Sequence, residues 1–428
     1  MKLLTDISRV LVGSLFIVSG LIKANDPLGF SYKLEEYFSV DVLNMSFLDP
    51  FVVELAVFIC VAEIVLGIAV LLGSKMKLAA WSLLLMILFF TFLTFYSAYF
   101  DKVTDCGCFG DALKLTPWQS FWKDIVLLFF VLIIFINQKK IQPNLLKSDL
   151  IMLSASLLLI AVFAAGVIGW WYPFWFAFGT FVIMLLLKHL FQHRQTDWML
   201  AATATFISLW FSVYCIRHLP MKDFRPYAVD KNIALGMEIP EGKQPPEYAY
   251  IYTLKHKQSG ENKEINSKDY VSSGIWKDEN WEITETSESI LMRAGYEPPI
   301  HDFVLTGTDG NDYTQDILAE PYIFLLVSYD IEEANETVQS EINKFVEAAN
   351  TSGHYFYGLT ASLYDDLEDF RHKHQNMFDF YSGDATMLKT IIRSNPGLVL
   401  LKEGTVIGKW HYNDFPEFEN VEKEYLNN

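Results

Sequence analysis

Residues 51–72 read FVVELAVFICVAEIVLGIAVLL and decide the fold class of the first half of the chain. A helix needs about 20 apolar residues to cross the hydrocarbon core of a bilayer, and this stretch supplies them. Six similar apolar runs lie before residue 217, at about 4–24, 78–100, 117–137, 149–168, 172–190 and 198–216. The sequence therefore predicts a multi-pass α-helical membrane protein with seven spans.

The first apolar run has a second interpretation. Ile22-Lys23-Ala24 loosely resembles a signal-peptide cleavage site, which would make residues 4–24 a removable leader. Lys2 alone supplies the basic region that precedes such a leader. The sequence therefore favours a membrane span at this position.

Charge divides the chain into two parts. Residues 1–216 carry 14 basic and 14 acidic side chains, so the whole net charge of −18 lies in residues 217–428. The first part suits a lipid bilayer and the second suits water. Because an acidic surface repels phosphates, nucleic acid is excluded as a partner.

Basic residues in the short loops predict the orientation of the spans. They occupy alternate loops, which lie on one side of the membrane: Lys75 and Lys77, then Lys139, Lys140 and Lys147, then Lys188 and Arg194. The positive-inside rule makes that side cytoplasmic. We therefore expect a bacterial inner-membrane protein with a cytoplasmic N-terminus and a periplasmic region after residue 217.

The acidic half contains two kinds of sequence. Residues 217–297 are charged and rich in turns, and the strand-like run at 248–254 predicts a small β-rich connector. Residues 298–428 alternate strand and helix patterns, with a buried strand at 322–328 and a helix at 338–349. This alternation predicts an α/β domain.

The end of the α/β region predicts a β-hairpin. Two apolar runs, 398–401 and 405–410, flank the turn Lys402-Glu403-Gly404. A parallel strand–helix–strand unit followed by this hairpin and a last helix defines the expected topology.

Residues 298–428 resemble the thioredoxin-like fold of thiol reductases and peroxiredoxins. The resemblance includes an entry hairpin at 300–310 and Ser394-Asn395-Pro396-Gly397, where that fold keeps a cis-proline. The paired cysteines of the fold follow its first central strand, but residues 328–333 have none, and no cysteine follows Cys215. We therefore expect a redox-inert module that docks a protein along an edge formed by Tyr329, Asp330, Asn395 and Pro396.

Cys106 and Cys108 are the candidate catalytic residues. They lie in Asp105-Cys-Gly-Cys-Phe-Gly-Asp111, a predicted outside loop between two spans. An oxidising compartment favours disulfides, and a Cys-Gly-Cys ring would be small and strained, which makes a good oxidant. Two alternatives stay open: a disulfide or dithiol that only pins the loop, and a zinc site, although two thiolates fill half of a tetrahedral shell.

The other cysteines and a histidine pair favour structural roles. Cys60 lies deep in the second span, and Cys215 lies at the outer end of the seventh, where a resolving thiol is the less favoured reading. His189 and His193 have the spacing of two metal ligands on a helix, but no third ligand is evident. We therefore predict no metal site.

The first four spans resemble the MauE family and the wider DoxX-like group of four-helix membrane proteins. The motifs that carry this resemblance are Arg9-Val-Leu-Val-Gly13 with Phe16, Ser19-Gly20-Leu-Ile-Lys23, Glu63-Ile-Val-Leu-Gly67, Asp105-Cys-Gly-Cys-Phe-Gly110 and the segment 118–124. The resemblance covers about residues 1–138 and leaves three further spans in 139–216. It implies a part in periplasmic disulfide formation or maturation during methylamine dehydrogenase assembly, beside a thioredoxin-like partner.

Ionisable residues inside spans are costly and are usually paired or functional. Arg9 and Glu63 lie at similar depths below the outer ends of their spans, so we expect an Arg9–Glu63 ion pair, either as a clamp or as a proton-handling group. Asp124 follows the helix start Thr116-Pro117 and would lie about two turns below the cysteine loop. It is a candidate proton acceptor for a leaving thiol, or a plain interfacial charge.

Three functions fit these features. The first is a membrane component of thiol–disulfide chemistry that holds a periplasmic or envelope protein. A quinone is the candidate cofactor of this function, as its electron acceptor. The second is a non-catalytic scaffold of an envelope complex, favoured by the absence of a second outside cysteine pair. The third, a transporter, is the weakest because no pair of broken helices stands out.

Overall fold

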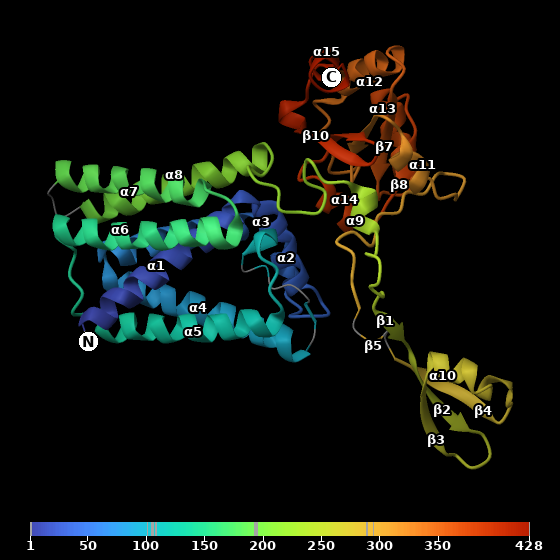
Figure 1. The fold of residues 1–428 in the computed structure, drawn as a ribbon, viewed down its shortest axis with the longest axis horizontal. Helices are drawn as coiled ribbons and strands as arrows, with labels where there is room; N and C mark the ends of the chain where they lie inside the picture. The colour runs from blue at the N-terminus through green and yellow to red at the C-terminus, as the bar shows by residue number, and fades with distance from the viewer. Residues whose placement is uncertain are drawn as a thin grey trace.

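The computed structural model describes residues 2–100, 102–103, 107, 109–191, 196–287, 290–293 and 295–427. Within these residues, seven helices are long and apolar enough to cross a membrane. They lie side by side in one bundle (Figure 1). Their bounds are α1 Lys2–Asn25, η1 with α3 Ser46–Leu72, α4 Met76–Phe100, α5 Pro117–Asn137, α6 with its π-helical end Leu146–Ile168, α7 Tyr172–Leu190 and α8 Thr196–Arg217. The prediction of seven spans is confirmed.

One further helix, α2 (Pro27–Phe38), lies between the first two spans and outside the seven apolar runs that the sequence predicted. Asp26 caps it, since its side chain accepts a hydrogen bond from the backbone N–H of Gly29 at 2.9 Å. Pro27 occupies the first turn, where its missing N–H costs nothing. The buried face of α2, which includes Phe30, Leu34 and Phe38, joins the same core as the bundle.

Glycines bring α1 and α3 into close contact. A Cβ atom added to Gly20 would lie 2.8 Å from the carbonyl oxygen of Cys60, and one added to Gly67 would lie 2.7 Å from the carbonyl oxygen of Gly13. Small residues at such crossings let two backbones approach, which drives helix association in lipid. Three glycines of the MauE-like motifs therefore have a packing role.

Five strands form one sheet in the order β10-β9-β6-β7-β8. The central strand β6 is parallel to β7 and antiparallel to β9, and β7 is parallel to β8. The strands are β6 Ile323–Val327, β7 Tyr355–Thr360, β8 Phe380–Ser382, β9 Gly397–Lys402 and β10 Thr405–His411. This mixed sheet, with helices on both faces, is a thioredoxin-like α/β fold and confirms the predicted fold class.

Alternation along β6 builds two cores, because successive side chains of a strand point to opposite faces. Ile323, Leu325 and Val327 pack on one face with residues of the helices α11 (Thr314–Ala319) and α14 (Ala385–Ile391). Phe324 and Leu326 pack on the other. The helices on that second face are α12 Gln339–Thr351, α13 Tyr364–His374 and α15 Phe418–Val421.

Two local predictions for this domain are confirmed. The hairpin between β9 and β10 turns at Glu403 and Gly404, whose φ angles are 46° and 72°. The peptide bond between Asn395 and Pro396 is cis. The cis-proline loop therefore directly precedes β9, beside the end of β6.

The residues directly after α8 pack in the thioredoxin-like module, and the chain then extends away from the module. Tyr227 and Ile233, the latter at the start of α9 (Ile233–Met237), belong to the module's core. The chain then runs out through β1 (Glu247–Ala249) to an arm that projects away from the rest of the molecule, and returns through β5 (Ile290–Arg293), which pairs with β1 (Figure 1). The arm holds the sheet β3-β2-β4. Its elements are β2 Ile251–His256, β3 Asn262–Asn266, α10 Ser267–Ser272 and β4 Trp281–Thr286.

Candidate functional site

The two candidate catalytic residues, Cys106 and Cys108, lie outside the described residues, but their neighbours are placed. Gly107 and Gly110 have φ angles of 61° and 49°, the left-handed conformation that glycine adopts without strain. Phe109 is buried, with its ring 5.8 Å from the ring of Phe163. Residues 109–111, which follow the two cysteines and are called the cysteine segment below, therefore lie against the helix bundle.

Asp111 of this segment contacts the thioredoxin-like module. Its carboxylate lies 3.7 Å from the Arg393 guanidinium, which also pairs with the Asp26 carboxylate at 3.0 Å. Burial raises the pKa of Asp111, and the nearby Asp26 raises it further, while Arg393 opposes both. Burial alone would lower the pKa of Arg393, but Asp26 and Asp111 raise it above its ordinary value. One buried cation thus joins α2, the cysteine segment and the module.

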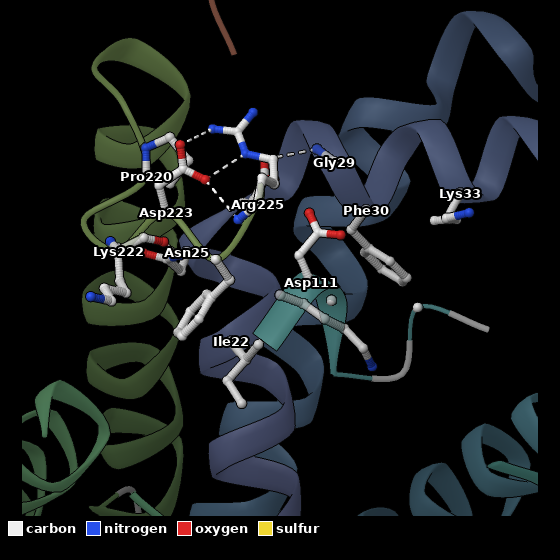
Figure 2. Close-up of a pocket in the computed structure, with 15 residues that line it drawn as sticks. Ile22, Asn25, Gly29, Phe30, Lys33, Asp111, Pro220, Lys222, Asp223 and Arg225 are labelled. Carbon is white, nitrogen blue, oxygen red and sulfur yellow. Dashed lines mark hydrogen bonds and ion pairs between the residues drawn. The ribbon is translucent and has the colours of Figure 1, made fainter. Parts of the chain in front are cut away.

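The residues around Asp111 line a small pocket of about 30 Å³. Figure 2 shows Asp111 between Phe30 of α2 and the pair of Asp223 and Arg225, which follow α8. Gly107 also lines this pocket, next to Lys33. The pocket therefore lies where the bundle, the cysteine segment and the chain leaving α8 meet.

Asp223 fixes the chain after α8 onto the sheet of the module. It accepts hydrogen bonds from Arg225 Nε at 2.7 Å and from Lys409 Nζ, on β10, at 2.8 Å. Burial opposes its ionisation, yet Arg225 and Lys409 hold the pKa of this carboxyl well below its usual range. Burial, with Arg225 close by, lowers the pKa of Lys409 to about 8. This ion triad holds the module beside the end of α8.

The predicted docking edge is assembled in the structure. Asn395 Nδ2 donates to the carbonyl oxygen of Asp330 at 2.6 Å, so the cis-proline loop and the segment after β6 lie together. The hydroxyls of Tyr329 and of Tyr32 in α2 are 3.3 Å apart. Burial raises the pKa of both phenols, so both stay protonated at neutral pH. Part of the edge is thus covered by the chain's own α2, and a docking role for it stays a prediction.

The predicted Arg9–Glu63 ion pair is wrong. Glu63 pairs instead with Lys23, whose Nζ lies 2.5 Å from Glu63 Oε1, and both side chains are buried. Arg9 donates to the carbonyl oxygens of Val70 and Leu71 at the end of α3, at 2.9 and 3.1 Å. Arg9 therefore adds donors to carbonyls in the last turn of α3, where the regular hydrogen bonds of a helix end.

An offset between the two helices explains the error. The prediction placed the outer ends of the first two spans, Ala24 and Phe51, at one level. In the structure Gly20 lies against Cys60 and Glu63, so Phe51 extends beyond Ala24 by about seven residues, or roughly 10 Å at 1.5 Å per residue. Glu63 thus lies beside Gly20, about one turn from Lys23 and about three turns from Arg9.

Asp124, the candidate proton acceptor, is buried in α5. Its carboxylate accepts a hydrogen bond from the Thr94 hydroxyl at 3.1 Å and lies 2.9 Å from the Lys123 ammonium. It lines a cavity in the bundle. Its proton-acceptor role stays a prediction.

That cavity has a volume of about 620 Å³ and lies among α1, α4, α5 and the end of α6. Phe109, the residue after Cys108 in the sequence, forms part of its wall. Four ionisable residues also line it: Lys23, Glu63, Lys123 and Asp124. The bundle therefore holds a ligand-sized space with charged groups beside the cysteine segment.

The remaining candidates play smaller parts in the structure. Cys60 and Cys215 are buried and form no disulfide with another described residue. No group of three or more His, Cys, Asp or Glu residues that could hold a metal ion occurs in the described part of the chain. His193 and the two cysteines of the zinc alternative lie outside that part.

The sequence analysis did not identify two charged residues of the site, Lys23 and Arg393. Lys23 was a detectable candidate, since it is a cation at the end of an apolar run. Arg393 carries no comparable signal, because it precedes the cis-proline loop in a soluble domain and meets Asp26 only through the fold.

The fold and this site define a multi-pass membrane protein with a C-terminal thioredoxin-like module. Residues 1–137 match the model of the family described as "Methylamine utilisation protein MauE", which confirms the predicted resemblance over these residues. No curated protein matches the chain.

Solved structures similar to part of this chain include three thiol-active proteins. The thioredoxin domain of a thiol-disulfide oxidoreductase from Bacteroides vulgatus is 16% identical over 28% of this chain and 91% of that one, with a TM-score of 0.23. A thiol:disulfide interchange protein from Bacteroides sp. is 15% identical over 30% and 88%, with a TM-score of 0.24. A thiol peroxidase from Chromobacterium violaceum is 16% identical over 30% and 84%, with a TM-score of 0.23.

Proposed function

We propose that this protein takes part in thiol–disulfide chemistry at the outer face of the bacterial inner membrane. Cys106 and Cys108 form the exchanging pair, and the substrate is a protein of the periplasm or envelope. The observation that carries the proposal is the position of the segment around them. Phe109 lines the cavity in the bundle, while Asp111 lies 3.7 Å from Arg393 of the thioredoxin-like module.

The chemistry is ordinary thiol–disulfide exchange. A substrate thiolate attacks one sulfur of the Cys106–Cys108 disulfide, which forms a mixed disulfide and releases the other cysteine as a thiolate. A second substrate thiolate then attacks the mixed disulfide, so the substrate leaves oxidised and the pair is left reduced. Asp124 is proposed to accept a proton near this pair.

The thioredoxin-like module supplies contacts and no sulfur chemistry. No cysteine follows Cys215 in the sequence, so the module has no thiol of its own. Its proposed part is to present the edge at Asn395, Pro396, Tyr329 and Asp330 to the substrate. The cis-proline loop lies in the module that Arg393 holds against the cysteine segment.

The charged loops support a periplasmic position for the module. Lys188 donates to the carbonyl oxygen of Asn144, and Lys75 lies 4.0 Å from Asp197, so the loops that carry the basic residues gather at one end of the bundle. The module lies at the opposite end (Figure 1). By the positive-inside rule, this arrangement supports a position of the module outside the cytoplasm.

Trapping of mixed disulfides tests this function. In a Cys106→Ser or a Cys108→Ser variant, the remaining thiolate can attack the disulfide of an already oxidised substrate, which is the reverse of the exchange and releases one substrate thiolate. The other cysteine of the pair is then missing and cannot release the mixed disulfide. We expect one of the two variants, alkylated in native membranes, to carry an envelope protein through a reducible bond. The matched control is Cys60→Ser, which removes a buried thiol and keeps the pair. If neither single variant captures a protein and both support growth, the proposal fails.

A specific contact favours a second candidate, a non-catalytic scaffold. The hydroxyl of Tyr329 already faces Tyr32 of α2, so part of the docking edge is occupied within the chain. In a scaffold, the cysteine pair would only pin its loop, and envelope partners would bind the acidic exterior. If the same envelope proteins copurify with the wild type and with a variant in which both cysteines are replaced by serine, that result would support the scaffold.

A further inference from the structure

The cavity in the bundle has a built polar end. Lys23 and Glu63 both line it, and their side chains are 2% and 4% exposed. Glu63 Oε1 accepts a hydrogen bond from the Lys23 ammonium. Glu63 Oε2 is also buried, and among the described residues none donates a hydrogen bond to it. A buried acceptor without a donor is costly, and more so when it is charged. This oxygen therefore calls for a ligand that carries a hydrogen-bond donor.

Lys23 offers the complementary group. An ammonium has three N–H donors, and Glu63 takes one of them. The Lys23 Nζ lies 4.6 Å from the ring centre of Phe90, which also lines the cavity. The same lysine lines the small pocket beside Asp111. One wall of the cavity thus presents an acceptor and a donor side by side, close to the cysteine segment.

Apart from Lys123, Asp124 and two uncharged polar side chains, the rest of the cavity wall is apolar, and the cavity reaches the lipid side of the bundle. Trp122 and Val126 line it from α5 and are 61% and 57% exposed, and in a bilayer this exposure faces acyl chains. The other apolar wall residues include Leu11, Leu15, Phe16, Leu127, Phe130 and Phe163. An apolar molecule can therefore enter from the membrane.

The lining charges restrict the class of ligand. Two lysines and two carboxylates line the cavity, so their formal charges cancel and favour a neutral head group. A phospholipid would bring a permanent anion next to Glu63. A quinone has carbonyl oxygens that accept from Lys23, and its reduced form has hydroxyls that donate to Glu63 Oε2. Its ring and apolar tail suit the remaining walls.

We propose that this cavity binds the head group of a lipid-soluble quinone, with Lys23 and Glu63 at the polar end. The inference rests on the proposed function, because a thiol pair that oxidises substrates must itself be reoxidised. In that step the two thiols lose two electrons and two protons, and a sulfur–sulfur bond forms. The quinone takes up both electrons and both protons and becomes the quinol.

Photolabelling tests the site in the full-length protein. The protein is placed in nanodiscs of pure phosphatidylcholine, labelled with an azidoquinone, and mapped by mass spectrometry. We expect labels on peptides of α1, α4 or α5 that line the cavity, and their loss with excess menaquinone-4. Labels spread evenly over the lipid-facing helices, or competition by phosphatidylglycerol in place of menaquinone-4, would overturn the proposal.

A matched pair of variants on one helix sharpens the test. Leu127→Trp fills the cavity, whereas Leu132→Trp adds the same ring to a position on α5 that does not line it. We expect labelling to fall about ten-fold or more in the first and to stay at the wild-type level in the second. Equal labelling of both variants would contradict the proposed site.

Two further variants separate this inference from the proposed function. Lys23→Met combined with Glu63→Leu removes the polar end without leaving a lone buried charge, and we expect about ten-fold weaker labelling. A variant with both Cys106 and Cys108 replaced by serine should be labelled like the wild type, because binding needs no thiol. Disulfide trapping without quinone labelling would contradict the quinone site alone. Quinone labelling without disulfide trapping would contradict the exchange function alone.

Discussion

Arg393 in the thioredoxin-like module forms an ion pair with Asp26, the residue that caps α2 at the end of the first membrane helix, at 3.0 Å. The two residues are 367 positions apart in the sequence. The Arg393 side chain is 7% exposed, so water screens this pair little. The module is therefore attached to the bundle by buried charge as well as by the chain.

Replacing Arg393 should loosen this attachment. Arg393→Gln leaves the Asp26 and Asp111 carboxylates close together without their cation, and removing one partner of a buried pair costs about 2–5 kcal/mol. We expect amide hydrogens of α2 to exchange about ten-fold faster or more, measured by mass spectrometry. Arg293→Gln, which removes an exposed arginine from the arm, is the control. Equal exchange in both variants would show that Arg393 does not hold the module.

Lys23 and Glu63 should show strong coupling in a double-mutant cycle. Glu63→Gln leaves the buried Lys23 ammonium without its counter-ion, and such a loss costs about 3–5 kcal/mol. Replacing both residues with apolar ones of similar size should restore most of that stability. Urea unfolding in detergent of the two single variants and of the double variant measures the coupling. Additive losses would contradict the pair.

Two glycine-to-alanine changes within membrane helices should have opposite effects. Alanine is favoured over glycine in a helix by about 1 kcal/mol, so Gly179→Ala, where no atom lies within 4 Å of the added methyl group, should stabilise the protein slightly. Gly20→Ala should destabilise it, because the methyl group would lie 2.8 Å from the Cys60 carbonyl oxygen. Thermal unfolding of the two variants checks the prediction. A higher melting temperature for Gly20→Ala would contradict the close crossing of α1 and α3.

Acid should weaken the junction between α8 and the module. Burial lowers the pKa of His411 to about 4, against an ordinary value of 6.5, although Asp414 opposes this shift. Between these pH values the folded state binds fewer protons than the unfolded state, so stability rises with pH and is lost as pH falls from 6.5 to 4. Protonation would also remove the acceptor that His411 Nδ1 offers to the backbone N–H of Asn413, whose side chain holds the end of α8 at Arg217.

The pH effect is measured by urea unfolding at several pH values. His411→Gln cannot titrate, so its stability should fall less between pH 6.5 and 4 than that of the wild type. His372→Gln changes a histidine whose side chain is 84% exposed, and it should keep the wild-type slope. Identical slopes in all three proteins would rule out His411 as the titrating group.

Structural features that depend only on neighbouring residues could be predicted from the sequence. Membrane spans need only length and hydropathy, and the turn at Glu403 and Gly404 is set by the residues that form it. An apolar run predicted the central strand of the thioredoxin-like sheet. The resemblance to the thioredoxin-like fold predicted the cis-proline. Each of these depends on a few neighbouring residues.

Features set by the relative height or docking of elements were not predictable from the pattern. The partner of Glu63 depends on how far α3 extends beyond α1. Helix α2, which follows α1 directly, is not among the elements that the sequence predicted. Its signal was present, because Asp26-Pro27 is a helix start of the kind recognised at Thr116-Pro117. The contact between Arg393 and Asp26 needs both domains folded, and no local pattern carries it.

The arm leaves and rejoins the module through neighbouring stretches of chain. The backbone N–H of Tyr296 donates to the carbonyl oxygen of Gln244 at 2.8 Å, and that of Ile300 donates to Gly236 at 3.1 Å. The arm thus begins and ends at almost the same point, as an inserted domain does. A reporter protein whose own termini lie close together could take its place, and its fluorescence or enzyme activity would tell, in living cells, which compartment that point occupies.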